Sequence, residues 1–180
     1  MASRLSCLLV VLAGLFPGPA AAVQLPDVEL FAIERDIGAA RAHAASLRRL
    51  DGVGQPPDAA AELVGISDGG RVATLRALRQ TGRRLERRLL PLTAACGQIG
   101  GEPQDVAAAI DGGLAGLGSL IEIVARSAGG AADRDLELER IDATLLWLDG
   151  ATAALWLLLR REAASASGDE LGTAHAFDHR

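Results

Sequence analysis

The 180-residue sequence contains no lysine, no asparagine and no tyrosine, and only 3% of its residues are aromatic. All 18 of its basic residues are therefore arginines. The codons of the three missing residues are rich in A and T, so their joint absence is typical of a GC-rich genome. The arginine content is consequently weak support for any function that depends on guanidinium groups.

Residues 1–22 have the organisation of a secretory signal peptide. Arg4 precedes a short apolar run from Leu5 to Phe16, and a Pro-Gly-Pro segment separates that run from three alanines that form an A-x-A cleavage site. The apolar run is too short to span a bilayer. We therefore expect cleavage after Ala22 and a mature protein that is periplasmic or secreted.

Cysteine is also scarce, since the chain contains only Cys7 and Cys96. Cleavage leaves Cys96 alone, which excludes an internal disulfide and favours a buried, unreactive thiol over a bond between two chains. Cleavage also changes the net charge from −5 to −6, because residues 1–22 contain one arginine and no acidic residue. A mildly acidic chain lacks the basic balance that nucleic-acid binding requires.

Four stretches have apolar residues spaced three and four apart, as in helices that bury one face. They cover residues 27–50, 68–96, 103–124 and 133–162. Pro91 lies inside the second stretch, where the stripe continues past it and predicts a kink instead of an end. Short Gly-rich connections predict an all-α, up-down-up-down four-helix bundle over residues 23–163. The small, polar residues 164–180 are predicted to form a disordered tail.

The fourth predicted helix is apolar on both faces between Ala143 and Leu159. Such a helix is a core helix, a membrane span or half of an interface. Residues 143–159 reach the lower length limit of a span, and Arg160-Arg161 follow like a stop signal. Asp149 near the middle would cost roughly 2.5–3.5 kcal/mol on insertion scales. A soluble bundle is therefore favoured over a span.

Glycines occupy helix positions where larger side chains usually pack. Gly112 and Gly116 have the spacing of a close helix contact, so we expect them to form a groove of small residues. Gly82 and Gly113 lie in apolar stripes, where they either face large side chains or leave space for a ligand. Packing against large side chains is the simpler interpretation.

The sequence lacks the motifs of common catalytic and cofactor sites. It contains no CxxCH, HExxH or GxSxG motif and no Glu-x-x-His pair of the kind that binds di-iron centres. His175 and His179 have a spacing that can hold a metal, but they lie in the predicted tail. His43 has no evident cysteine or histidine partner. We therefore expect no enzymatic activity, no cofactor and no metal site.

Arginines crowd the second predicted helix. Arg76, Arg83 and Arg87 lie opposite its leucine stripe, so they form an exposed basic face. Such a face usually only solvates a helix, and it also suits an acidic partner or anionic lipids. These three arginines, with Trp147 and Trp156 of the fourth helix, are the candidate residues for binding a partner.

Charged residues at the edges of two stripes predict the register of the bundle. Asp135 and Asp142 lie seven residues apart along the fourth helix, and Arg41 and Arg48 lie seven apart along the first. In antiparallel neighbours, Arg41 would approach Asp142. Arg48 would approach Asp135 in the same arrangement. Edge charges fix register in this way in coiled coils.

These features together predict an exported, non-catalytic bundle that acts by binding a protein partner or by self-association. Two alternatives stay open. One is a single-pass periplasmic protein anchored by a span near residues 143–159. The other is a bundle that binds a small apolar ligand beside Trp147 and Trp156. Membrane association is possible but not favoured, and binding of nucleic acid is not expected.

Overall fold

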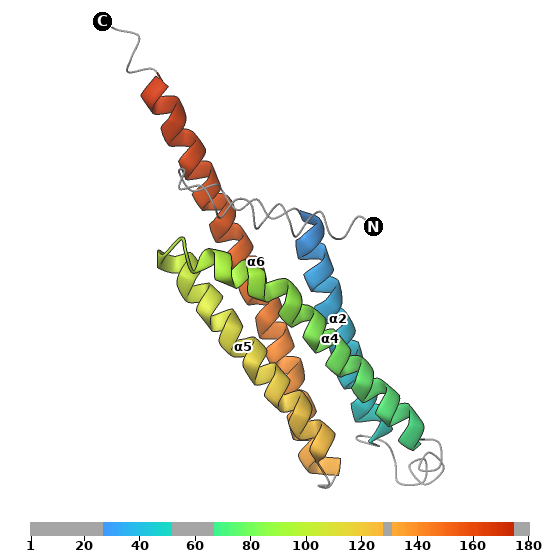
Figure 1. Ribbon diagram of the computed structural model, residues 1–180. Helices are drawn as coiled ribbons and strands as arrows, with labels where there is room; N and C mark the ends of the chain where they lie inside the picture. Colours follow the sequence, from blue (N-terminus) through green and yellow to red (C-terminus); the bar gives the residue numbers. More distant parts are fainter. Residues whose placement is uncertain (1–26, 52–66, 128–130, 175–180) are drawn as a thin grey trace, which may run out of the picture. The chain divides into compact units, whose positions relative to one another are not determined.

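The computed structural model describes residues 27–51, 67–127 and 131–174. These residues are helical, with short turns and without strands. The helices, labelled in Figure 1, are α2 (Asp27–Leu50), α4 (Ser67–Cys96), α5 (Gly101–Arg126) and α6 (Ala131–Ala174). The predicted signal peptide and its cleavage site after Ala22 lie outside the described residues, as do His175 and His179.

The chain divides into two compact units, of which Leu25–Leu158 is one. Helix α6 crosses the boundary and continues through Ala174. The predicted end of the last helix at Glu162 is therefore wrong, and helix occupies part of the segment in which we expected a disordered tail. The physical reason is composition, since this segment is rich in alanine, the best helix former, and contains no proline.

Within Leu25–Leu158, each helix buries the apolar stripe that its spacing predicts. Side chains three and four residues apart fall on one face and pack against the stripes of neighbouring helices. The all-helical prediction with four helices is thereby confirmed. The buried apolar residues are Ile33, Ile37, Ala40, Ala44 and Leu47 of α2; Leu78, Leu85, Leu89, Leu92 and Cys96 of α4; Ala107, Ile110, Leu114, Leu117, Ile121 and Val124 of α5; and Leu138, Ile141, Leu145, Leu148 and Leu155 of α6.

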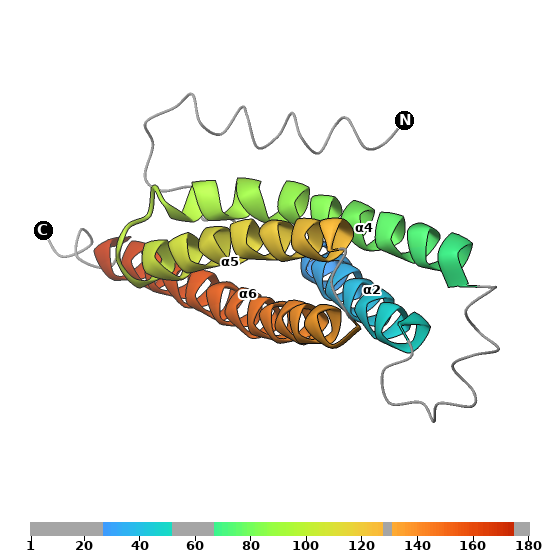
Figure 2. The same ribbon diagram turned by 90° about the horizontal axis from the view of Figure 1, so that it is seen from below.

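Successive helices run in opposite directions (Figures 1 and 2). Ion pairs between α2 and α4 follow this order. Asp51, which follows α2, pairs with Arg71 near the start of α4. Asp36, earlier in the chain, pairs with Arg88 farther along α4. Helix α4 packs closely against both α2 and α5, so α4 lies between them.

The connection from α4 to α5 depends on two glycines. Gly100 and Gly101 have φ angles of 79° and 63°, a region that glycine enters without the steric cost of a Cβ atom. Pro103 follows in the first turn of α5, where its missing N–H group would have no helical partner in any case. Helix α4 passes through Pro91 without ending and changes direction near its C-terminal end (Figure 1).

Cys96 is a free thiol in the last turn of α4. Its side chain is fully buried, and burial raises its pKa because the thiolate would lose its hydration. The thiol is therefore protonated at neutral pH and shielded from reagents and from other chains.

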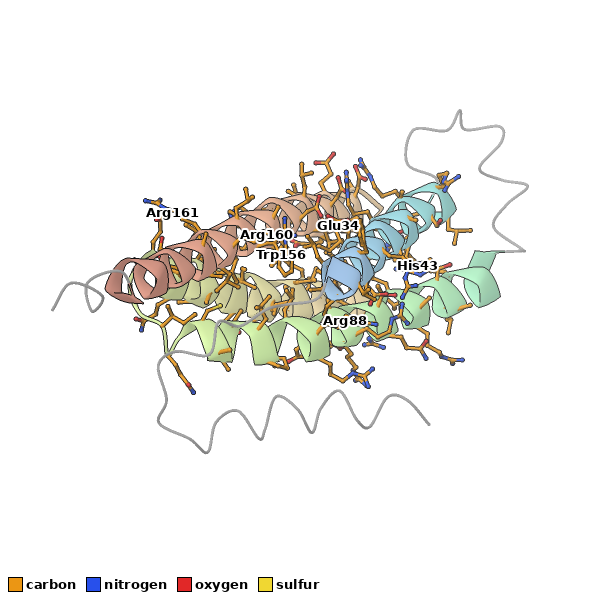
Figure 3. The ribbon with its side chains drawn as sticks, turned by 90° about the horizontal axis from the view of Figure 1, so that it is seen from above. Glu34, His43, Arg88, Trp156, Arg160 and Arg161 are labelled. Carbon is orange, nitrogen blue, oxygen red and sulfur yellow. The ribbon has the colours of Figure 1, made fainter. Side chains whose placement is uncertain are left out.

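Two buried carboxylates, Asp36 and Asp51, each form ion pairs with two arginines. Asp36 of α2 is 4% exposed and binds Arg84 and Arg88 of α4, at 3.3 and 3.1 Å. Arg88, labelled in Figure 3, also donates to Glu29 of α2 at 2.6 Å. These contacts tie α2 to α4 around the buried carboxylate of Asp36, while the side chains of its partners stay partly exposed.

Asp51 forms the second of these clusters at the end of α2. Its carboxylate lies 3.3 Å from Nε of Arg71 and 3.1 Å from Nε of Arg134. The side chain of Asp51 is 4% exposed. Because Arg71 belongs to α4 and Arg134 to α6, one carboxylate holds the starts of both helices beside the end of α2.

Candidate partner-binding surfaces

The outward side of α6 is apolar from Ala143 to Leu157. Three large side chains on it, Leu146, Trp147 and Leu157, are 55%, 45% and 67% exposed. Their neighbours on the same side are small, and the spacing of three and four residues joins them into one continuous row. We call this row the α6 stripe; its exposed members are Ala143, Leu146, Trp147, Gly150, Ala153, Ala154 and Leu157.

The α6 stripe lies on a helix whose inward side is equally apolar. Leu145, Leu148 and Leu155 on that inward side are completely buried. Scattered apolar residues are normal on protein surfaces, whereas a contiguous apolar row usually marks an interaction site. The α6 stripe is therefore the strongest candidate interface in the described part of the chain.

Trp147 lies at the edge of the α6 stripe that faces α5. A Cβ atom built on Gly113 of α5 would lie only 2.5 Å from Cζ3 of Trp147 and 3.2 Å from Cδ2 of Leu148. The indole ring therefore rests directly on the glycine backbone. The groove of small residues expected at Gly112 and Gly116 receives no neighbouring helix among the described residues, because both glycines are exposed and no side chain or other helix would lie within 4 Å of a Cβ on either.

Trp156 lies on a different side of α6 from Trp147 and faces α2 (Figure 3). It is half-buried and lines a cavity of about 10 Å³ with Leu30, Ile33, Leu92 and Thr152. Ligand pockets are typically about 300–1,000 Å³, so this cavity is too small for an apolar ligand. The buried hydroxyl of Thr152 has no hydrogen-bond partner among the described residues, and the volume matches about one water molecule.

Gly82 does not leave an empty space in the core between α4 and α5. A Cβ atom on Gly82 would lie 3.1 Å from Cδ1 of Ile121, so the isoleucine of α5 fills the position. Gly82 and Gly113 thus each face a large side chain of a neighbouring helix. Complementary packing of small and large residues accounts for both glycines.

The basic face of α4 is exposed as the sequence predicts. Arg76, Arg83 and Arg87 all lie at the surface, and Nε of Arg87 donates to the backbone oxygen of Arg83 at 3.2 Å. Because α4 packs against α2 and α5, it lies across the bundle from α6, with α5 between them in Figure 2. The candidate partner-binding residues therefore divide between two separate surfaces.

An open groove of about 620 Å³ lies between α4 and α5. Gly82, Arg83 and Leu117 are among the residues that line it. Arg79 bridges α4 to Glu122 of α5, with Nη2 2.7 Å from Oε2. The hydrogen bond from Arg79 lowers the pKa of Glu122 more than any other contact. The charges that line the groove therefore partly neutralise one another.

The predicted register is present between α2 and α6. Nε of Arg41 lies 2.7 Å from Oδ1 of Asp142, and Nε of Arg48 lies 2.6 Å from Oδ1 of Asp135. Arg48 also contacts Glu139 at 3.0 Å, a partner that the sequence analysis did not identify although Glu139 lies one helical turn after Asp135. The two helices are therefore antiparallel neighbours.

Exchanging the charges of Arg41 and Asp142 tests how this pair acts. Asp142→Arg alone should lower the free energy of unfolding slightly, by no more than about 1 kcal/mol, because both side chains are more than 40% exposed. Adding Arg41→Asp should restore most of that loss. Urea unfolding of the two single variants and the double variant measures the coupling. Losses that simply add would mean that the pair does not contribute to register.

The described residues contain no cluster of three or more His, Cys, Asp or Glu side chains that could hold a metal ion. His43 lies on α2, partly buried and close to the side that faces α4 (Figure 3). His43 therefore does not belong to a group of metal-binding side chains among the described residues.

Two helical segments in the described part of the chain are long and apolar enough to cross a membrane. They are Gly101–Arg126 and Ala132–Ser165. In the most apolar 18 residues of each segment, only 28% is buried, so burial in the core does not account for most of their apolar character. Length and composition alone do not distinguish a span from a bundle helix with an exposed apolar side.

Comparison with known proteins adds no further constraint. No family model, no curated protein and no solved structure matches the chain.

Proposed function

We propose that the protein is an exported, non-catalytic, up-down-up-down helical bundle that acts by binding a protein partner through the α6 stripe. The observation that carries this proposal is the row formed by Leu146, Trp147 and Leu157 on the outward side of α6. Interfaces are enriched in aromatic side chains, and a few residues, often tryptophan, contribute most of the binding free energy when they lose contact with water.

Trp147 is well suited to anchor such an interface. Its ring is held by contact with Gly113 and is still 45% exposed. A side chain that is already fixed before binding loses little conformational entropy when the partner arrives. Trp156 is half-buried against α2, so it contributes to the core more than to the proposed interface.

Export is the part of the proposal that rests on the sequence of residues 1–22. Removal of this segment after Ala22 would place the bundle in the periplasm or outside the cell. The lack of catalytic motifs in the sequence supports a binding role over catalysis. Arg76, Arg83 and Arg87 lie across the bundle from α6, and in this proposal they keep the protein soluble and steer its approach to acidic surfaces.

Site-directed photo-crosslinking in the native host tests the proposal. A benzoylphenylalanine at Leu157 should yield a crosslinked species that mass spectrometry identifies as protein, and the same probe at Leu90 of α4 should not. Leu90 is the matched control because it is also a large exposed apolar side chain, 43% exposed, and lies on the opposite helix. Equal crosslinking from both positions, or none from Leu157, would contradict the proposal.

A membrane span near residues 143–159 is the alternative that the length and apolar character of α6 support. In that arrangement Asp142 and Asp149 would lie in or beside the bilayer, where carboxylates are costly. The ion pair of Asp142 with Arg41 and the burial of Leu145 and Leu148 favour the bundle instead. Carbonate extraction of native membranes discriminates, because only an integral span would stay in the pellet.

A further inference from the structure

We infer that the protein partner of the α6 stripe is a second copy of this chain, and that the two α6 helices cross antiparallel at Gly150. This inference rests on the proposed function, since it assumes that the α6 stripe binds protein. It is carried by the order of large and small residues along the stripe, by the charges at its margin, and by its length.

Large and small residues of the α6 stripe are arranged symmetrically about Gly150. Ala143 and Leu157 each lie seven residues from it. Leu146 and Ala154 each lie four residues away, on opposite sides. Trp147 and Ala153 each lie three residues away. An antiparallel crossing at Gly150 therefore brings every large side chain of one copy against an alanine of the other, and glycine against glycine at the centre.

A parallel pair of the same helices packs poorly. It would place Leu146 against Leu146 and Leu157 against Leu157 of the two copies, and would leave glycine facing glycine between them. Helices held apart by the leucine layers would leave empty space at Gly150, and protein interfaces avoid such voids because they forfeit dispersion contacts. The antiparallel pair has one large and one small residue in each layer, so the helices can stay close along the whole contact.

Charge at the margin of the stripe also favours the antiparallel pair. Glu139 continues the stripe four residues before Ala143, is exposed, and pairs with Arg48 of α2 at 3.0 Å. Parallel helices would place the two Glu139 side chains opposite each other, where like charges repel and each Arg48 offsets only part of the repulsion. In the antiparallel pair the two Glu139 residues lie about 33 Å apart, at a rise of about 1.5 Å per residue.

The α6 stripe stays on one side of the helix over its whole length. Ala143, Gly150 and Leu157 recur every seven residues, and Leu146 and Ala153 lie between them. The stripe is about 21 Å long and one helix wide. Such a contact is smaller than the roughly 800 Å² per partner of a standard interface, so the dimer should be reversible and dependent on concentration.

A lipid surface fits the same stripe less well. Helices that lie on membranes usually have basic residues along the border of their apolar face, because these residues attract anionic headgroups. Asp142 and Asp149 lie along one border of the α6 stripe, where Asp142 pairs with Arg41 of α2, and Arg140 lies along the other border. A border of mixed charge suits a protein surface better than the basic border that anionic lipid favours.

Single-cysteine variants of the mature chain test the orientation of the pair, in a Cys96→Ser background. Oxidation of a mixture of the Ala143→Cys and Leu157→Cys proteins should give a disulfide-linked dimer, whereas either protein alone should give little. Gly150→Cys alone should form the dimer, because this position lies on the symmetry axis. Ala94→Cys, exposed on α4, is the control and should stay monomeric. Efficient linkage of Ala143→Cys to itself would overturn the antiparallel arrangement.

Light scattering on the otherwise unmodified mature chain tests the dimer itself. The mass should rise towards twice the monomer value as concentration increases. Gly150→Leu should weaken the dimer at least tenfold, because leucine at the crossing forces the helices apart. Gly116→Leu is the matched control on α5, where an added Cβ atom would have no neighbouring side chain within 4 Å, and it should leave the dimer unchanged. Circular dichroism should show that both variants keep the helical content of the parent.

The two experiments separate this inference from the proposed function. A protein that stays monomeric at every concentration, yet crosslinks from Leu157 to a different protein, would overturn the second copy and leave the proposed function standing. A monomer with no crosslinking from Leu157 would overturn both. Dimerisation that Gly150→Leu leaves intact would place the contact elsewhere and overturn the α6 crossing.

Discussion

Replacing Asp36 with alanine is expected to lower the free energy of unfolding by about 2–3 kcal/mol. The carboxylate is 4% exposed and accepts from Arg84 and Arg88 on the neighbouring helix. Its removal takes the ion pair with Asp36 from both arginines, and Arg88 keeps only its contact with Glu29 as a carboxylate partner among the described ion pairs. Loss of a buried carboxylate acceptor is costly for the guanidinium groups that face it. The expected loss stays below that of a fully buried pair because Arg84 and Arg88 are 42% and 30% exposed.

The matched control for Asp36 is Asp142, which also pairs with an arginine on a neighbouring helix. Asp142 is 44% exposed, so Asp142→Ala should cost no more than about 1 kcal/mol. Asp36→Asn should fall between the two, because the amide keeps one acceptor and loses the charge. Urea unfolding of the three variants at neutral pH gives the comparison. Equal losses for Asp36→Ala and Asp142→Ala would mean that burial does not strengthen the Asp36 contacts.

Asp36 also illustrates a limit of the sequence. The sequence assigns Arg76, Arg83 and Arg87 to an exposed basic face and gives no role to Arg84 and Arg88. Arg84 and Arg88 lie on the flank that turns towards α2. Spacing along α4 alone shows only that these arginines border its apolar stripe, and it does not show which border faces a neighbouring helix. Only the rotation of α4 against α2 determines which flank meets a carboxylate.

The features that the sequence did predict depend on spacing within one helix. The three-four pattern of apolar residues identified the four helices and their buried faces, because burial of one face is the main driving force for each helix. The heptad spacing of Arg41 and Arg48 matched that of Asp135 and Asp142, so the antiparallel register followed from rise per residue alone. The predicted end of the last helix at Glu162 is wrong because the apolar periodicity stops there, whereas the helix continues through small and polar residues to Ala174.

The candidate interface was only half predictable. The sequence identified an apolar excess on the last helix and named Trp147 and Trp156 together. Both sides of that helix are apolar, so hydrophobicity does not determine which side faces inward. Packing against α2 and α5 makes that choice. It turns Trp156 towards α2 and leaves Trp147 at the margin of an exposed row.

Glycine positions in α5 lead to a second large effect, because adjacent glycines should respond in opposite ways. Gly113→Leu is expected to lower the free energy of unfolding by about 2–3 kcal/mol. Even the first added atom would lie 2.5 Å from Trp147 and 3.2 Å from Leu148, so the indole ring and the buried leucine must both move. Gly112→Leu meets no described atom within 4 Å of the new Cβ. It should stabilise the helix by up to about 1 kcal/mol, since leucine has the better helix propensity.

Urea unfolding of the two leucine variants measures this difference in the free energy of unfolding directly. Trp147 fluorescence reports whether the indole ring is displaced. In Gly113→Leu the indole should lose its contact with α5, and its emission should shift to longer wavelength because the ring becomes more exposed to water. Trp147→Ala should then rescue part of the loss when it is combined with Gly113→Leu, because the cavity left by the ring accommodates the new side chain. Trp147→Ala combined with Gly112→Leu should give no such rescue. If Gly113→Leu and Gly112→Leu were equally stable, the ring of Trp147 would have to swing aside at no cost, and α5 would not hold it in place for a partner.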